Sequence, residues 1–174
     1  VSYQKSDSEW LKSPDFKIIH GLQNLIGVYE KICSHKNKRI YVIQPTTSML
    51  AAVKKIPAEK LISLNTMVRD NKIIFDSIIH QDYMIRYMNQ YLAEKDSVKT
   101  QKGILQSFEK RMSDLSVIDK EYLNVGSEIY IVDSQIFILS WKDETCIEIK
   151  NREIVSLIKG LFMFAKNHSV KINY

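Results

Sequence analysis

The chain contains 174 residues, of which 45% are hydrophobic and 26% are charged, and this is the composition of an ordinary globular domain. With only five glycines and three prolines, it is too apolar to be disordered, and no apolar run approaches the roughly 20 residues of a membrane-spanning helix. The net charge of +5 is spread along the chain, so we interpret it as a solvated surface rather than a phosphate-binding patch. Two widely separated cysteines, Cys33 and Cys146, are expected to be reduced and buried, as in a cytoplasmic protein.

The first half of the chain alternates between strand and helix patterns. Residues 16–20 form a short apolar run closed by a glycine, and residues 22–35 carry apolar side chains at helical spacing. Residues 39–44 are almost continuously apolar, which is typical of a strand buried on both faces. A helix over 46–56 and a strong strand over 73–79 are expected to follow.

The second half begins with a predicted helix at 83–95 and a less regular stretch at 96–114, within which a short amphipathic helix is expected. A hairpin, a further strand and a last helix follow, at residues 128–132 paired with 135–141, at 145–150 and at 152–167. We therefore predict an α/β fold with a mixed, mostly parallel sheet flanked by helices on both faces.

Sequence motifs for common chemistry are absent. The chain has no GxGxxG or phosphate-loop motif, no HExxH or paired CxxC, and no GxSxG. No metal site and no cofactor are therefore expected. The four histidines are scattered, and we interpret each as a structural residue.

The order of the elements resembles a known family. The pieces that carry the resemblance are residues 14–21 leading into a helix, the strand and polar loop over 40–48, the hairpin over 127–140, and residues 147–154 leading into an apolar helix. Together they resemble the C-terminal effector domain of TrmB-like transcriptional regulators over roughly residues 14–165. The resemblance implies a phospholipase D-like fold.

Active phospholipase D-type enzymes carry the motif HxKxxxxD, in which the histidine attacks the phosphodiester and the lysine stabilises its oxygens. If Asp133 is aligned with the aspartate of the motif, Gly126 stands at the position of the histidine and Glu128 at that of the lysine. The nucleophile is missing, and an anion that repels phosphate replaces the cation. We therefore expect a chain that is not an enzyme, in which Asp133 is a turn residue.

A ligand site is expected where the parallel strands end, because ligands of open α/β sheets bind beyond the carboxyl ends of the strands. Neutral hydrogen-bonding side chains with one aromatic ring would suit a polyol or sugar, and the resemblance also implies a small-molecule effector. An alternative is that residues 46–48 only cap the helix that follows them. The candidate ligand-binding residues are Gln44, Thr46, Thr47, Ser48, His80, Gln81, Glu128, Ser140 and Trp141.

In the resembled family a winged helix-turn-helix domain and a helical linker that pairs protomers precede the effector domain. Residues 1–13 are too few for a DNA-reading unit, so we interpret them as a tail or the end of a linker helix, and residues 14–174 as a single effector domain. The expected protein is a cytoplasmic, ligand-sensing homodimer. It would contact DNA only through a helix-turn-helix domain that is not present in this chain, and it would not contact a membrane.

Two alternatives stay open. The first is a protein-interaction or dimerisation module without a small-molecule ligand, which a pocket too small to admit a ligand would favour. It has some support from a possible stripe of Met84, Tyr87, Met88 and Tyr91 in the predicted helix at 83–95. The second is a phosphodiesterase-type hydrolase that acts through residues outside the known motif.

Overall fold

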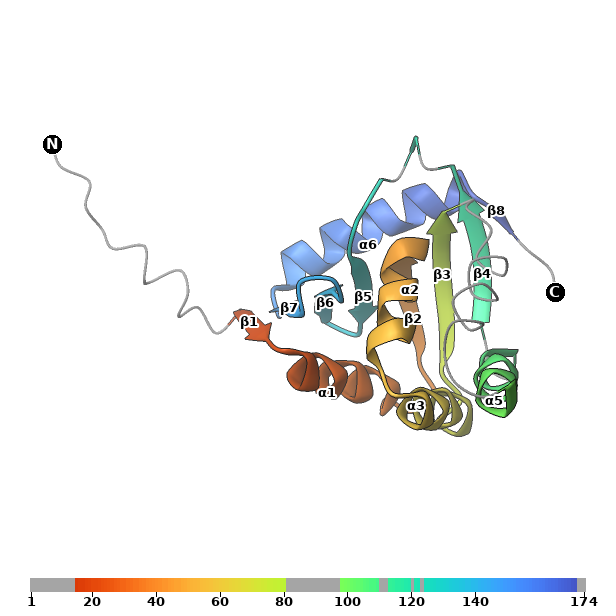
Figure 1. Cartoon of the computed structure of the whole chain (residues 1–174). Coiled ribbons are helices and arrows are strands. Elements are labelled where there is room, and N and C mark those ends of the chain that lie inside the picture. The colour runs from red at the N-terminus through yellow and green to blue at the C-terminus, as the bar shows by residue number, and fades with distance from the viewer. Residues whose placement is uncertain (1–14, 81–97, 110–112, 120, 123, 172–174) are drawn as a thin grey trace, which may run out of the picture.

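The computed structural model describes residues 15–80, 98–109, 113–119, 121–122 and 124–171. In these parts of the chain the strands form one eight-stranded sheet (Figure 1). The strands are β1 (Phe16–His20), β2 (Arg39–Gln44), β3 (Ile74–His80), β4 (Ser113–Ile118), β5 (Glu128–Val132), β6 (Gln135–Ser140), β7 (Thr145–Ile149) and β8 (Val170–Lys171). The helices are α1 (Leu22–Cys33), α2 (Thr46–Lys55), α3 (Ala58–Asp70), α5 (Val98–Glu109) and α6 (Arg152–Asn167). None of the described helices is long and apolar enough to cross a bilayer.

The strand order is β1-β7-β6-β5-β2-β3-β4-β8, and most neighbours run antiparallel. Only the pairs β2–β3 and β3–β4 are parallel, so the prediction of a mostly parallel sheet was wrong. The reason lies in the connections: β5, β6 and β7 follow one another through short turns, and strands joined in this way must pair antiparallel. The βα units that force parallel pairing occupy only the middle of the chain.

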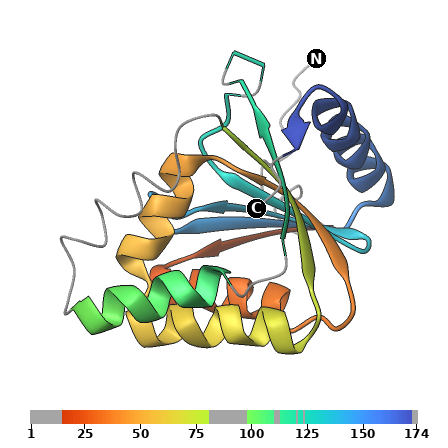
Figure 2. The same cartoon turned by 90° about the vertical axis from the view of Figure 1, so that its right-hand side faces the viewer.

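Helices cover both faces of the sheet, as predicted, but unequally. Helices α1, α2, α3 and α5 lie against one face, whereas α6 is the only one of the described helices that crosses the other face (Figures 1 and 2). Alternation along each strand sends side chains to two separate apolar cores. The first core joins Ile40, Val42 and Phe75 of the sheet to the four helices. The second joins Ile43 and Ile78 to Phe162 of α6.

Three described elements, α3, β4 and the two-residue strand β8, were not predicted from the sequence. The buried residues of α3 include Leu61, Leu64 and Val68, whose helical spacing is visible in the sequence but follows a proline that suggests a turn. In β4 the polar Asp114 and Ser116 interrupt the apolar pattern of a strand. They are accommodated because Ser116 is buried beside β3 and Asp114 forms an ion pair with Arg39.

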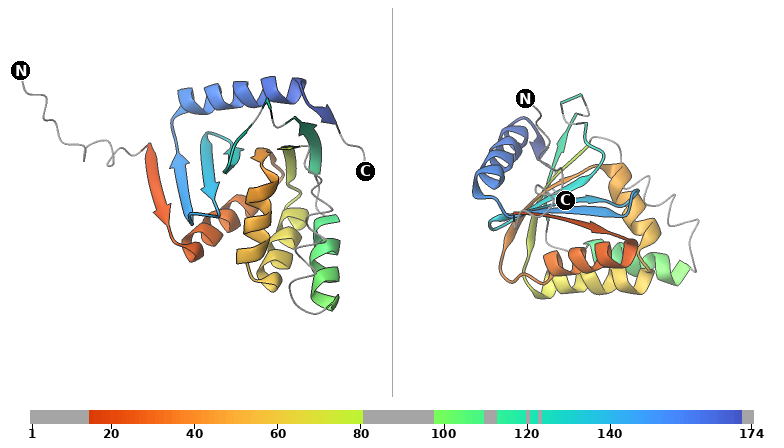
Figure 3. Two further views of the ribbon diagram at one scale, coloured as in Figure 1. Left: turned by 45° about the horizontal axis from the view of Figure 1, so that its top comes forward. Right: turned by 90° about the vertical axis from the view of Figure 1, so that its left-hand side faces the viewer.

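Helix α6 has the bounds that the sequence predicted, and its two ends are held differently. At its start, the Asn151 side chain accepts hydrogen bonds from the backbone N–H groups of Glu153 and Ile154, at 3.1 Å each. Near its end, Lys166 Nζ lies 2.6 Å from Asp76 Oδ1 on β3. The helix is thereby fixed across one end of the strands, from β7 towards β8 (Figure 3).

Candidate functional site

The three parallel strands end at one edge of the sheet, where β5 begins. Strand β2 ends at Gln44 and β3 at His80. Strand β5 runs antiparallel to β2, with Ile129 opposite Ile43. The register therefore brings the first residue of β5, Glu128, beside Gln44.

Glu128 lies at the centre of a buried hydrogen-bond cluster, and only 1% of its surface is exposed. Its carboxylate accepts hydrogen bonds from Tyr130 Oη at 2.7 Å, Trp141 Nε1 at 3.0 Å and Gln44 Nε2 at 3.2 Å. Because an isolated carboxylate is costly to bury, these donors are what allows Glu128 to lie inside the core. We call Gln44, Glu128, Tyr130 and Trp141 the Glu128 cluster.

Strand geometry explains why these side chains meet. Glu128 and Tyr130 are two residues apart on β5, so they point to the same face of the sheet. Leu139 of β6 lies opposite Glu128, and Trp141, two residues further along, points to that face as well. Tyr29 of α1 packs edge-on against both aromatic rings, with centroids 5.8 Å from Tyr130 and 5.9 Å from Trp141.

A small cavity adjoins the cluster between the sheet and helices α2, α3 and α5. Its volume is about 20 Å³, which is room for about one water molecule. The polar part of its wall comes from the Glu128 cluster, and the apolar part includes Met49 of α2 and Phe108 of α5. A ligand of sugar size does not fit this cavity as it stands.

The predicted residues of the loop after β2 do not join the cluster. Thr47 is exposed, and Thr46 is described only as the first residue of α2. Ser48 is buried, and its Oγ has no hydrogen-bond partner. The alternative role of these residues as helix caps was wrong, because the N-cap of α2 is Pro45 and no side chain caps the helix.

The remaining predicted residues lie elsewhere. His80 is buried at the end of β3 with its Nε2 lacking a hydrogen-bond partner, and alternation from Ile78 places it on the α6 side of the sheet. Ser140 donates a hydrogen bond to Asp143 Oδ2 at 2.6 Å in the turn after β6. Gln81 and the predicted helix at 83–95 are outside the described residues. Of the nine candidates, the structure brings Gln44, Glu128 and Trp141 together.

Sequence reasoning missed Tyr130 and Tyr29. Tyr130 could have been found, because it lies two residues after Glu128 on a predicted strand and must share its face. Tyr29 comes from α1, and its position beside Trp141 depends on how that helix packs on the sheet. No local signal in the sequence identifies it.

The positions aligned with the phospholipase D motif do not form a catalytic group. Gly126 is exposed and precedes the strand, and a Cβ added there would meet no atom within 4 Å. Asp133 lies at the opposite end of β5 from Glu128, in the hairpin turn with φ 51°. Its carboxylate pairs with Lys38 Nζ at 2.7 Å on the surface, so Asp133 is the turn residue that the sequence predicted.

Another buried carboxylate, Glu148 of β7, pairs with two lysines. Lys31 Nζ lies 3.0 Å and Lys150 Nζ 3.4 Å from its Oε1. Burial alone would raise the pKa of Glu148, but the hydrogen bond and charge of Lys31, helped by Lys150, lower it below its usual range. Within the described part of the chain, no group of three or more His, Cys, Asp and Glu residues is arranged to hold a metal ion.

No family model matches the sequence, and no curated protein does. Solved structures with a similar fold include the following three. TrmBL2, an archaeal chromatin protein with a novel mode of DNA binding, aligns with a TM-score of 0.53 at 14% identity over 97% of this chain and 57% of its own. Nuc of Salmonella typhimurium, a phospholipase D family member, aligns with a TM-score of 0.52 at 11% identity over 91% and 98%. NucT of Helicobacter pylori aligns with a TM-score of 0.54 at 10% identity over 91% and 100%.

These similarities define the fold. The chain has a phospholipase D-like α/β fold, which is shared by Nuc and NucT over nearly their whole lengths and by TrmBL2 over part of its length. The fold that the sequence resemblance implied is thus confirmed. The chain spans a little over half the length of TrmBL2, and identities of 10 to 14% establish shared architecture rather than shared activity.

Proposed function

We propose that this chain is a catalytically inactive regulatory domain that senses a small-molecule effector, as the resemblance to TrmB-like regulators implies. The observation that supports the proposal is that Glu128 is buried and hydrogen-bonded inside the protein. Where a phospholipase D-type enzyme needs a cation, this chain has a carboxylate, and that carboxylate accepts three hydrogen bonds inside the protein. Such a group repels a phosphodiester, and Gly126 stands where the motif has its nucleophilic histidine.

The chemistry of the Glu128 cluster suits a neutral polyol or sugar. An amide, a phenol and an indole surround the carboxylate, and together they offer hydrogen-bonding groups beside aromatic surfaces. Because the cavity holds about one water molecule, an effector of sugar size requires α2 or α5 to move away from the sheet. A ligand that favours an opened state over a closed one is what a sensor needs to shift its conformation.

The size of the cavity favours a second candidate function. A domain with no room for a small molecule can instead act as a protein-interaction or dimerisation module. In that case the Glu128 cluster would serve only to specify one packing of the core.

A thermal-shift screen against sugars, polyols, sugar phosphates and nucleotides separates these candidates. An effector at 100 times its Kd should stabilise the domain by about 2.7 kcal/mol. Replacing Trp141 by Phe, which removes the Nε1 donor to Glu128, should abolish that shift. The matched control Thr47→Ala should leave it unchanged, because Thr47 is exposed outside the cluster.

Absence of a shift with every class of compound would contradict effector sensing and leave the interaction module. An assay with bis-(p-nitrophenyl) phosphate tests the remaining alternative. We expect no hydrolysis above background, and turnover that persists in Glu128→Ala would show a phosphodiesterase that uses other residues.

A further inference from the structure

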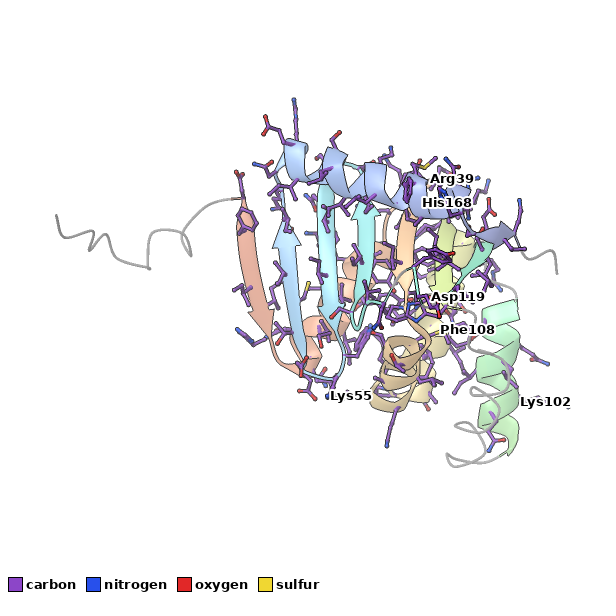
Figure 4. The ribbon with its side chains drawn as sticks, turned by 90° about the horizontal axis from the view of Figure 1, so that it is seen from above. Arg39, Lys55, Lys102, Phe108, Asp119 and His168 are labelled. Atoms are coloured by element: carbon purple, nitrogen blue, oxygen red, sulfur yellow. The ribbon has the colours of Figure 1, made fainter. Side chains whose placement is uncertain are left out.

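Helix α6 covers only one end of the strands on its side of the sheet. Figure 4 shows β1, β7, β6 and β5 continuing beyond the helix. The residues beneath α6 are fully buried, as Ile131, Ile136 and Ile149 show. On each strand, the next side chain on this face, two residues away from the helix, is less buried.

These less covered side chains form a row of isoleucines in register. The row crosses four neighbouring strands, β1, β7, β6 and β5. Its paired members, in that order, are Ile18, Ile147, Ile138 and Ile129. Ile18 is 47% exposed and the other three are half-buried. Only from Ile43 of β2 onwards is the same row buried.

The outer surface of α6 extends this apolar surface. Leu157, Leu161 and Phe164 are 62%, 55% and 66% exposed and follow the i, i+4, i+7 spacing of one helix face. Both lysines of the helix, Lys159 and Lys166, lie on its other flank, over Tyr41 and beside Asp76. We define the open apolar face as Phe16, Ile18, Ile129, Ile138, Ile147, Leu157, Leu161 and Phe164.

The dimensions of this face suit an interface with another folded surface. Helix α6 has 16 residues and is about 24 Å long, and the isoleucine row crosses four strands, or about 14 Å. The helix and the isoleucine row lie side by side, and together they form a face on the order of 500 Å², at the upper range for monomeric proteins. Two such faces packed together bury about 1,000 Å², which reaches the lower limit of specific interfaces.

We propose that two copies of this chain pair through the open apolar face. The face is self-complementary because none of its eight residues is charged, so packing it on itself opposes no like charges. When two α6 helices cross antiparallel on this face, opposite ends of their helix dipoles approach each other. The inference rests on the proposed function in one respect, since it names the surface by which a regulatory domain of this kind pairs its protomers.

The test is the oligomeric state of the chain, measured by sedimentation equilibrium between about 1 and 100 μM. We expect the wild-type chain to be a dimer and the variants Leu161→Glu and Ile18→Glu to raise the dimer Kd at least tenfold. The matched control is Gln23→Glu, which adds the same charge to an exposed position on α1 at the other face of the sheet and should dimerise as the wild type does.

Each outcome decides the proposal. A wild-type chain that stays monomeric, or variants that dimerise unchanged, would overturn it. Because the substituted side chains are about half exposed, the variants should keep their helical circular dichroism, and this separates lost pairing from lost folding. The proposed function fails by different measurements, namely phosphodiester hydrolysis or the absence of a thermal shift with any effector. Neither measurement depends on whether the chain dimerises.

Discussion

At the scale of single residues, two of the buried carboxylates show different partners. Glu128 accepts hydrogen bonds from Tyr130 and Trp141, whereas Glu148 faces Lys31 and Lys150. The second arrangement has a consequence for Cys146, two residues before Glu148 on the same face of β7. Burial, reinforced by the negative charge of Glu148, raises the pKa of the Cys146 thiol to about 12.

Cys146 should therefore resist alkylation in the folded protein. The thiolate is the reactive form, and at pH 8 almost none is present when the pKa is about 12. Peptide mapping by mass spectrometry after treatment with iodoacetamide should find Cys146 unmodified in the native protein and modified after unfolding in guanidinium chloride. Modification of native Cys146 at the rate of a free thiol would contradict this placement.

At the scale of elements, α6 depends on its two ends, because it is the only described helix on its side of the sheet. The cap at Asn151 fixes where the helix begins. At the far end, Arg39 and Lys166 both contact Asp76 of β3, at 3.0 and 2.6 Å, and Figure 4 labels Arg39 and His168 in this corner of the molecule. These ion pairs hold the end of the helix over the parallel strands.

Replacing Asn151 by Ala should lower the free energy of unfolding by about 1 kcal/mol, the usual cost of losing an N-cap. The reason is that two backbone N–H groups lose their acceptor. Urea denaturation followed by circular dichroism measures the change. Asn167→Ala, in the exposed last turn of the same helix, is the control and should change stability by less than about 0.5 kcal/mol. Equal effects at both ends would show that the cap does not stabilise α6.

At the scale of the whole molecule, ion pairs join elements that are distant in sequence. Lys31 of α1 reaches Glu148 of β7, and Arg39 of β2 reaches Asp114 of β4. Burial alone would raise the pKa of Asp114, but the Arg39 hydrogen bond and the charges of Lys166 and Lys171 lower it. Glu148 and Asp114 therefore both have lowered pKa values in the folded state.

The domain should lose stability in acid through these two groups. A carboxylate whose pKa is lower in the folded state stabilises the fold above its unfolded pKa, and that contribution disappears as the pH falls through the folded value. The free energy of unfolding should thus decrease from about pH 5 downwards. Urea titrations between pH 7 and pH 3 measure it, and Glu148→Gln should flatten the dependence. A wild-type stability that is constant over this range would contradict the prediction.

Much of the local structure could be predicted from the sequence. The bounds of α6 and the hairpin of β5 and β6 were correct, because a cap residue marks the helix and two apolar runs joined by a two-residue turn mark the hairpin. Gln44, Glu128 and Trp141 were also identified as site candidates, and they do meet. The parallel direction predicted for most of the sheet was wrong. Strand β4 was missed because its polar residues are explained only by contacts with other strands.

The sequence by itself determined which segments are strands and helices along most of the chain, and which chemical groups are present at the position of the phospholipase D motif. These are local properties, set by side-chain periodicity and residue type. Only the tertiary structure decided that Gln44 of β2 bonds to Glu128, that Tyr29 of α1 packs beside Trp141, and that a row of isoleucines lies open beside α6. Strand order and register bring together residues far apart in sequence, and no local pattern specifies that pairing.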